Sequence, residues 1–169
     1  MVSDMKIRRV IRHLFMPAWM ARRYFPVRSL KSIEEEIRRS EAAHAGEIRF
    51  AVEAALDLHS LLRGKTARER AIEVFSNLRI WDTEHNNGVL IYLLLADRQV
   101  EVVADRGVHR HVGGPGWGEI CWKMEKAFRQ GDFEHGAIEG IRAVAGHLAK
   151  HFPASGTNKN ELPDQPVML

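Results

Sequence analysis

The fold is decided by the stretch "NNGVLIYLLLADRQVEVVADRG", residues 86–107. Residues 89–96 are apolar at both odd and even positions, which is typical of a strand that is covered on both of its faces. Asp97-Arg98 follows as a short turn, and residues 99–104 return as a second strand. The stretch therefore predicts an antiparallel hairpin at the centre of a small mixed sheet.

Helical patterns flank this hairpin. Capping boxes at Ser32–Glu35 and Thr66–Glu69 predict helices that run to about residues 45 and 80. Residues 47–56 alternate like a half-buried strand, and 58–65 are predicted to be a loop. After the hairpin, a glycine-rich loop at 111–118 precedes two helices with apolar stripes, which are separated by Gly131-Asp132-Phe133. The predicted fold class is α/β, a three-layer α/β/α sandwich with helices on both faces of the sheet.

The composition excludes several classes of protein. Cys121 is the only cysteine, so an internal disulfide and a thiolate-rich metal site are both excluded, and a reducing, cytoplasmic location is expected. Lysine and arginine outnumber acidic residues up to Ile33, giving +7, whereas the remainder carries −4. Because the body of the chain is mildly acidic, we do not expect a nucleic-acid partner.

The charge separates residues 1–28, a basic N-terminal arm, from a domain over residues 29–152. The arm has no signal-peptide pattern and no apolar run long enough to span a membrane. Its apolar residues recur at helical spacing, with basic residues on the other side; they are Ile7, Val10, Ile11, Leu14 and Phe15. Two interpretations stay open: a helix docked on the domain, or peripheral contact of residues 5–25 with an anionic inner-membrane surface. Residues 153–169 are polar and rich in proline and asparagine, which predicts a disordered tail.

The polar stretch "WDTEHNNG", residues 81–88, precedes the apolar strand directly. With a two-residue turn at Asp97-Arg98, Leu90 is expected opposite Asp105, and Gly88 opposite Gly107. The segment "ADRG" would then end at the sheet edge where this polar stretch begins. Carboxylate and amide oxygens from two segments suit a hard cation, calcium or magnesium. The candidate metal ligands are Asp82, Glu84, Asn86, Asn87 and Asp105; ordinary turn chemistry before a buried strand is the alternative.

Residues 86–107, followed by "GDFEHGAIEGI" at 131–141, resemble the TPM-domain family of bacterial and plant proteins, which was first linked to phosphatase activity in thylakoids. The resemblance covers about residues 29–152. It implies an α/β/α sandwich with a calcium site at a loop edge of the sheet, and a proposed acid-phosphatase-like activity in some members. Asn87-Gly88 matches the family's Asn-Gly and Asp132 its Gly-Asp-aromatic turn. Asp105-Arg106-Gly107 stands where many members have Gly-Tyr-Gly.

Other polar residues are candidates for catalysis. Arg106 beside a bound cation could orient a phosphate, and His85 could act as a general acid or base. His109 and His111 alternate like a transition-metal pair, although no third ligand is evident apart from Asp105. No nucleophile motif is present, and Cys121 lies on the apolar stripe of a helix. We therefore expect a non-enzymatic, calcium-binding module with an unidentified protein partner. A metal-dependent phosphatase of phosphomonoesters is the alternative.

Overall fold

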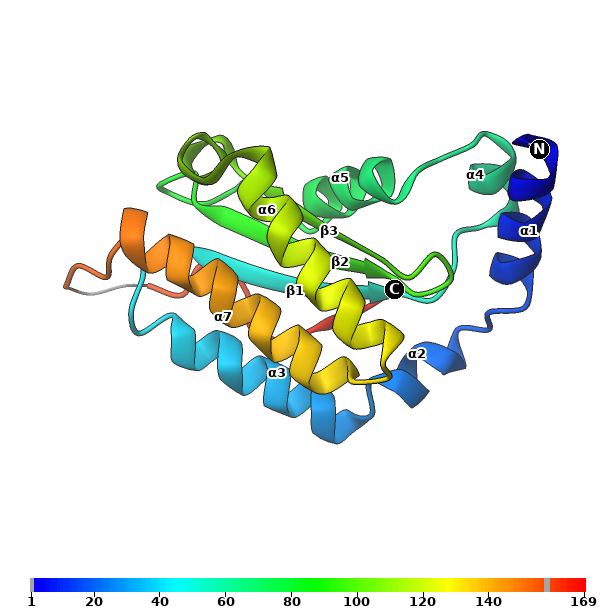
Figure 1. Ribbon diagram of the computed structural model, residues 1–169. Coiled ribbons are helices and arrows are strands. Elements are labelled where there is room, and N and C mark those ends of the chain that lie inside the picture. The colour runs from blue at the N-terminus through cyan, green and yellow to red at the C-terminus, as the bar shows by residue number, and fades with distance from the viewer. Residues whose placement is uncertain (1, 157–158) are drawn as a thin grey trace.

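The computed structural model describes residues 2–156 and 159–169. Helices pack against a four-stranded mixed sheet whose strand order is β3-β2-β1-β4 (Figure 1). The elements are α1 (Val2–Leu14), α2 (Trp19–Tyr24), α3 (Val27–Ser40), β1 (Glu47–Glu53), α4 (Leu58–Leu62), α5 (Ala67–Asn77), β2 (Gly88–Leu94), β3 (Gln99–Ala104), α6 (Arg106–Arg129), α7 (Phe133–His151) and β4 (Val167–Met168). None of the described helices is long and apolar enough to cross a membrane.

Two hydrophobic clusters form the core, one on each face of the sheet. Ile48, Phe50 and Ile91 belong to the cluster that α3, α6 and α7 cover. Leu90 and the apolar ring of Tyr92 point to the opposite face, which α5 covers. This arrangement confirms the predicted α/β/α fold class. Every residue of β1 is buried, so the prediction of a half-buried strand was wrong there.

The antiparallel hairpin is confirmed, but its predicted register was wrong by two residues. Leu90 lies opposite Val103 instead of Asp105, and β2 is central while β3 forms an edge of the sheet. The cause is a longer turn: the amides of Leu95 and Ala96 bond to Glu53 and Ala54, at the end of β1 and directly after it, not to β3. A slip of two residues preserves which face each side chain occupies. The polar stretch therefore still meets the end of β3.

Several predicted helix boundaries differ from the structure. The capping box at Thr66 is confirmed, with both reciprocal bonds present. Helix α3 instead starts at Val27 behind Pro26, and Ser32 lies inside it, bonded to Arg28 O at 3.2 Å. Residues 58–62 form α4, and the predicted loop at 111–118 lies within α6, which is kinked at Gly113 (φ 72°). The glycines in this segment had favoured a loop, whereas the structure has a helix that begins directly after Asp105.

The C-terminal segment, predicted to be disordered, is placed against β1 over residues 159–169. Val167–Met168 forms β4, which pairs in parallel with Ala51 and Val52. The Glu47 carboxylate accepts hydrogen bonds from the amides of Glu161 and Leu162, at 3.0 and 3.2 Å. These long-range bonds order a segment whose own composition has no strand pattern.

The charges under this segment predict a pH-dependent stability. Burial, then the nearby carboxylates of Glu47 and Asp164, raise the pKa of Glu41 to about 8. The stability that this proton contributes is fully present below the ordinary glutamate pKa, and it is lost as pH rises from there through about 8. Glu41→Gln, neutral throughout, should match the wild type at about pH 4 and exceed its unfolding free energy by ~2 kcal/mol at about pH 9. Urea unfolding at the two pH values measures this.

The matched control for this experiment is Glu35→Gln, because Glu35 is exposed on α3. It should change stability by less than ~0.5 kcal/mol at both pH values. An advantage of Glu41→Gln that is equal at the two pH values would contradict the assignment.

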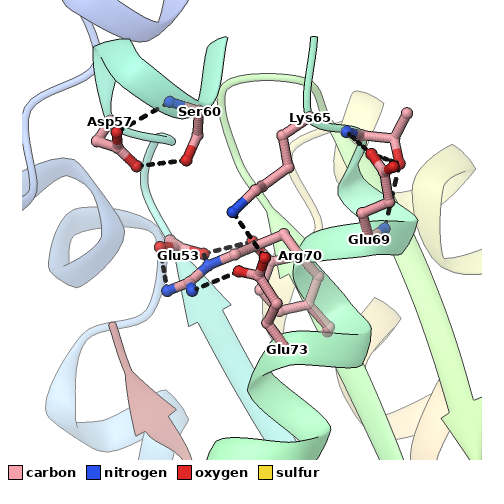
Figure 2. A network of polar contacts seen from close by, with 9 residues as sticks. Glu53, Asp57, Ser60, Lys65, Glu69, Arg70 and Glu73 are labelled. Carbon is pink, nitrogen blue, oxygen red and sulfur yellow. Dashed lines mark hydrogen bonds and ion pairs between the residues drawn. The ribbon is translucent and has the colours of Figure 1, made fainter. Parts of the chain in front are cut away.

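A polar network lies on the α5 face of the sheet, at the carboxyl end of β1 (Figure 2). Arg70 donates two hydrogen bonds to the Glu53 carboxylate, at 2.8 and 2.9 Å, and a third to Glu73 at 3.2 Å. Lys65 donates to Glu73 at 2.7 Å, and the Tyr92 hydroxyl donates to Glu53 at 2.5 Å. The network fastens α5 to the end of the sheet opposite the polar stretch 81–88.

Candidate functional site

The polar stretch and the start of α6 come together at the edge of the sheet where β2 begins. Asp105 is the N-cap of α6: its Oδ1 accepts a hydrogen bond from the amide of Arg106 at 2.6 Å. Its own amide donates to Gly88 O at 2.9 Å, which joins it to β2. Asn86 adopts a left-handed backbone conformation with φ 51°. The loop thus turns sharply beside the first turn of the helix.

Gly107 permits this close approach. A Cβ atom at Gly107 would lie 2.3 Å from Asn86 O and 3.1 Å from His85 O. Gly88 is constrained in the same way, because its Cβ would lie 2.1 Å from Ile80 O. These are backbone atoms, which cannot move aside as a side chain can. The two glycines therefore bring the loop, β2 and α6 into contact.

A cavity of about 550 Å³ opens where these segments meet. Its lining combines a carboxylate, an amide, two guanidinium groups and an aromatic ring; the residues are Trp81, Asn86, Asp105, Arg106, Gly107 and Arg110. Asp105 Oδ2 is buried and has no hydrogen-bond partner in the described structure. An unpaired buried carboxylate oxygen is costly, so it indicates a group that a ligand can satisfy.

The structure brings only some of the predicted site residues into this cavity. Asn86, Asp105 and Arg106 line it, whereas Asp82, Glu84 and His85 are exposed on the loop and do not. The backbone amide of Glu84 instead bonds to the Glu161 carboxylate, at 3.1 Å for the nearer oxygen.

Asn87, a predicted ligand, is fully buried and fixes the loop from within. Its side-chain amide donates to Ala45 O at 2.7 Å, and its backbone amide donates to Thr83 Oγ1 at 3.1 Å. Its carbonyl accepts from the amide of Glu47 at 3.3 Å, next to the start of β1. These contacts give Asn87 a structural role in the loop, although its Oδ1 atom is buried and has no hydrogen-bond partner among the described residues.

Sequence reasoning missed Trp81 and Arg110, which both line the cavity. Arg110 lies one helical turn after Arg106, so both guanidinium groups reach the same space. The Arg110 Nε atom donates a hydrogen bond to Arg106 O at 3.4 Å, so its side chain lies back against the preceding turn of the helix. The sequence signal for Arg110 is its i, i+4 spacing from Arg106. This spacing places two side chains on the same side of a helix, but the sequence pattern predicted a helix that starts only after residue 118.

The remaining candidates lie elsewhere. His111 stacks on His151, with ring centroids 4.7 Å apart, and His109 lines a different cavity beside Cys121. Burial raises the pKa of the Cys121 thiol to about 11, so it stays protonated at neutral pH. Asp132 precedes α7 without a side-chain cap bond. In residues 2–156 and 159–169, no three His, Cys, Asp or Glu side chains are arranged to hold a metal.

Comparisons with known proteins agree with this architecture. The family model described as "TPM domain" matches residues 23–147. The solution structure of BA42 from the psychrophilic bacterium Bizionia argentinensis is similar, with 30% identity and a TM-score of 0.74 over 85% of this chain and 94% of that one. The N-terminal domain of a protein from P. gingivalis shares the fold, at 19% identity and a TM-score of 0.56 over 72% and 76% of the two chains.

No curated protein matches the chain. The family match nevertheless covers well over half of the chain, and it includes the hairpin, the loop at 81–88 and the helix that Asp105 caps. The chain belongs to the TPM-domain family.

Proposed function

We propose that the cavity beside Asp105 holds a divalent cation, with calcium as the preferred ion, and that the domain acts as a non-enzymatic binding module. The observation that carries this proposal is the buried Asp105 Oδ2, which has no hydrogen-bond partner. Asn86 supplies an amide oxygen beside it, so the donors are hard oxygen atoms from two chain segments. Asp105 and Asn86 are the residues that would hold the ion.

The charges around the cavity set the expected affinity. Asp105 is the only carboxylate among the described residues that line it, and Arg106 and Arg110 bring two positive charges. Calcium affinity rises with the number of ligand charges, so a site with one carboxylate belongs to the weak class, with Kd on the order of 10⁻⁴–10⁻³ M. The ion would join the loop to α6 and thereby stabilise the domain.

The same two arginines favour one alternative, a metal-dependent hydrolase of phosphomonoesters. Guanidinium groups bind phosphate through paired hydrogen bonds, and a cation can polarise a phosphoryl oxygen. Arg106 and Arg110 lie on the same cavity as Asp105, which suits an anionic ligand beside the ion. Among the described residues, no Ser, Thr, Cys or His side chain lines the cavity as a nucleophile or base. The non-enzymatic function is therefore preferred.

A calcium titration followed by thermal melting tests the proposal. At millimolar calcium the melting temperature of the wild type should rise by a few degrees, as a stabilisation of ~1 kcal/mol gives in a domain of this size. Asp105→Asn should lose this rise, because it removes the carboxylate charge yet keeps an N-cap of similar quality. A generic phosphomonoester should not be turned over by either protein.

Asp57→Asn is the matched control. Asp57 is also an N-cap, with its Oδ1 accepting from the amide of Ser60 at 3.0 Å, but it caps α4, away from the cavity. It should keep the full calcium response. A wild type that does not respond to calcium would contradict the proposal. Turnover that disappears in both Asp105→Asn and Arg106→Gln would establish the hydrolase instead.

A further inference from the structure

Helix α1 docks on the domain through its polar side. Arg9 and Arg12 form ion pairs with Asp97, at 2.8 and 3.2 Å, and His13 Nε2 lies 3.1 Å from the same carboxylate. His13 is buried, and its Nδ1 accepts a hydrogen bond from the amide of Leu56 at 2.9 Å. Burial alone would raise the pKa of Asp97, but the bonds from His13 and Arg9 outweigh it and lower that pKa to about 2. Asp97 therefore stays charged and fixes the rotation of α1.

Val10 packs against the core, but this docking leaves the other apolar residues of the arm's stripe facing solvent. Phe15 is 82% exposed, and Leu14 and Trp19 are 62% and 60% exposed. Ile7 and Ile11, which share this side of the helix, are about half exposed. An amphipathic helix that packs on its own domain normally buries its apolar stripe. Here the stripe is the side that the domain does not cover.

The exposed apolar residues are concentrated in this region. Helix α4, which contacts α1, adds exposed Leu58 and Leu62. Seven of the twelve large hydrophobic side chains exposed in the described chain lie on α1, the α1–α2 connection, α2 or α4. Contiguous apolar patches of this kind mark interaction surfaces. We call the surface of Ile7, Ile11, Leu14, Phe15 and Trp19 the apolar stripe below.

The cations beside the apolar stripe indicate what covers it. The exposed basic residues of the arm are Lys6, Arg8, Arg12, Arg22, Arg23 and Arg28. No acidic residue occurs between Lys6 and Ile33 in the sequence. A protein partner or a second copy of this acidic domain would have to match this unbroken positive charge locally. A bilayer of anionic phospholipid supplies negative charge and an apolar interior over the whole area.

We propose that the apolar stripe and its basic neighbours form a docking surface for anionic phospholipid bilayers. The apolar side chains enter the boundary between headgroups and acyl chains, while the arginine and lysine groups contact the phosphates. Trp19 and Phe15 have the aromatic character that favours this depth. Docking holds α1 in the membrane plane, and Asp97 transmits that orientation to the sheet.

The proposed surface lies away from the candidate cation site. Asp97 follows the carboxyl end of β2, whereas the cavity adjoins Gly88 at the opposite end of the same strand. Figure 1 shows α1 at one end of the sheet and the start of α6 at the other. A membrane-bound domain would therefore keep the cavity open to solvent. The two sites can be tested separately.

Flotation with vesicles of phosphatidylglycerol and phosphatidylcholine at low salt tests the proposal on the full chain. The wild type should bind these vesicles, should not bind vesicles of phosphatidylcholine alone, and should lose binding at ~0.5 M salt. Ile11→Ser with Phe15→Ser should reduce partitioning more than tenfold. The matched control is Ile72→Ser with Trp122→Ser, which removes comparable exposed side chains from α5 and α6 and should leave binding unchanged.

A second pair of variants tests the charges. Arg8→Gln with Arg22→Gln should weaken binding at least tenfold, since each cation near an anionic surface contributes about fivefold. Arg38→Gln with Lys123→Gln removes two exposed cations elsewhere and should have little effect. Asp105→Asn should bind vesicles like the wild type, so failure of the cation site would not imitate failure here.

Three results would overturn the proposal. The first is a wild type that binds no anionic vesicle at low salt. The second is binding that Ile11→Ser with Phe15→Ser leaves intact. The third is self-association of the wild type in light scattering, removed by the same double variant, together with no vesicle binding. That result would show that the apolar stripe serves protein contacts.

Discussion

Replacing Arg70 by methionine is expected to lower the free energy of unfolding by about 3–4 kcal/mol, the largest effect of a single exchange outside the apolar core. The Glu53 side chain is 11% exposed, and Arg70 is its only cationic partner in the described structure. Methionine fills similar space but leaves the carboxylate buried without its counter-charge. The loss should appear in urea unfolding as a lower midpoint with an unchanged slope.

The remaining hydrogen bond cannot replace the guanidinium group. Burial raises the pKa of Tyr92, and the Glu53 carboxylate raises it further, so the hydroxyl stays protonated and donates one bond. The two bonds from Arg70 are charge-assisted and bidentate, which is the stronger arrangement. The exchange also removes the contact of Arg70 with Glu73, which then keeps Lys65 alone as its cationic partner in the described structure. Helix α5 would then be held to the end of β1 by apolar contacts alone.

Arg129→Met is the matched control for this prediction. Arg129 pairs with Glu125 at 3.3 Å, but its side chain is 54% exposed, so its removal should cost less than ~0.5 kcal/mol. Adding Glu53→Gln to Arg70→Met removes the buried carboxylate that has lost its counter-charge, and it should recover part of the lost unfolding free energy. A loss below ~1 kcal/mol for Arg70→Met, equal to that of the control, would contradict the assigned role of the network.

The hairpin shows how far the sequence could predict the fold. The two-sided apolar pattern of residues 89–94 indicated a buried strand, and the structure places β2 at 88–94, between β1 and β3. The pattern continued into Leu95 and Ala96, which were assigned to the hairpin although their amides bond to Glu53 and Ala54. A local pattern cannot tell which neighbour an amide selects. Asp97 is further held by α1, more than 80 residues away in sequence.

The position of the C-terminal segment and the full lining of the cavity could not be predicted from local sequence patterns, because both depend on contacts between distant segments. Glu47 and Arg49 lie on one face of β1, and both are buried. Glu47 accepts hydrogen bonds from backbone amides of the C-terminal segment, and Arg49 donates to backbone carbonyls there, all within residues 161–165. That requirement was visible in the strand, but its distant partner was not. In the cavity, Asn86 and Asp105 were predicted, whereas Arg110 followed only once α6 was known to start at Arg106.

Gly107→Ala tests whether the close approach of loop and helix creates the candidate site. The added Cβ would meet two backbone carbonyls of the loop, at 2.3 and 3.1 Å, so either the loop or the first turn of α6 must move. Overpacking of this kind costs about 2–3 kcal/mol. Because Asn86 O and Asp105 lie on the two sides of that contact, the shift should also separate the oxygen donors and abolish the calcium-dependent rise in melting temperature.

Gly118→Ala separates this effect from helix propensity, because Gly118 lies on the same helix and no heavy atom lies within 4 Å of its added Cβ. That exchange should be neutral or stabilise by up to ~1 kcal/mol, and it should keep the calcium response. If Gly107→Ala were as stable and as responsive as Gly118→Ala, the loop would be free to yield. The cavity could then not depend on the contact between Gly107 and Asn86. The expected difference between the two variants would show that the site requires a residue without a side chain at position 107, as well as the carboxylate of Asp105.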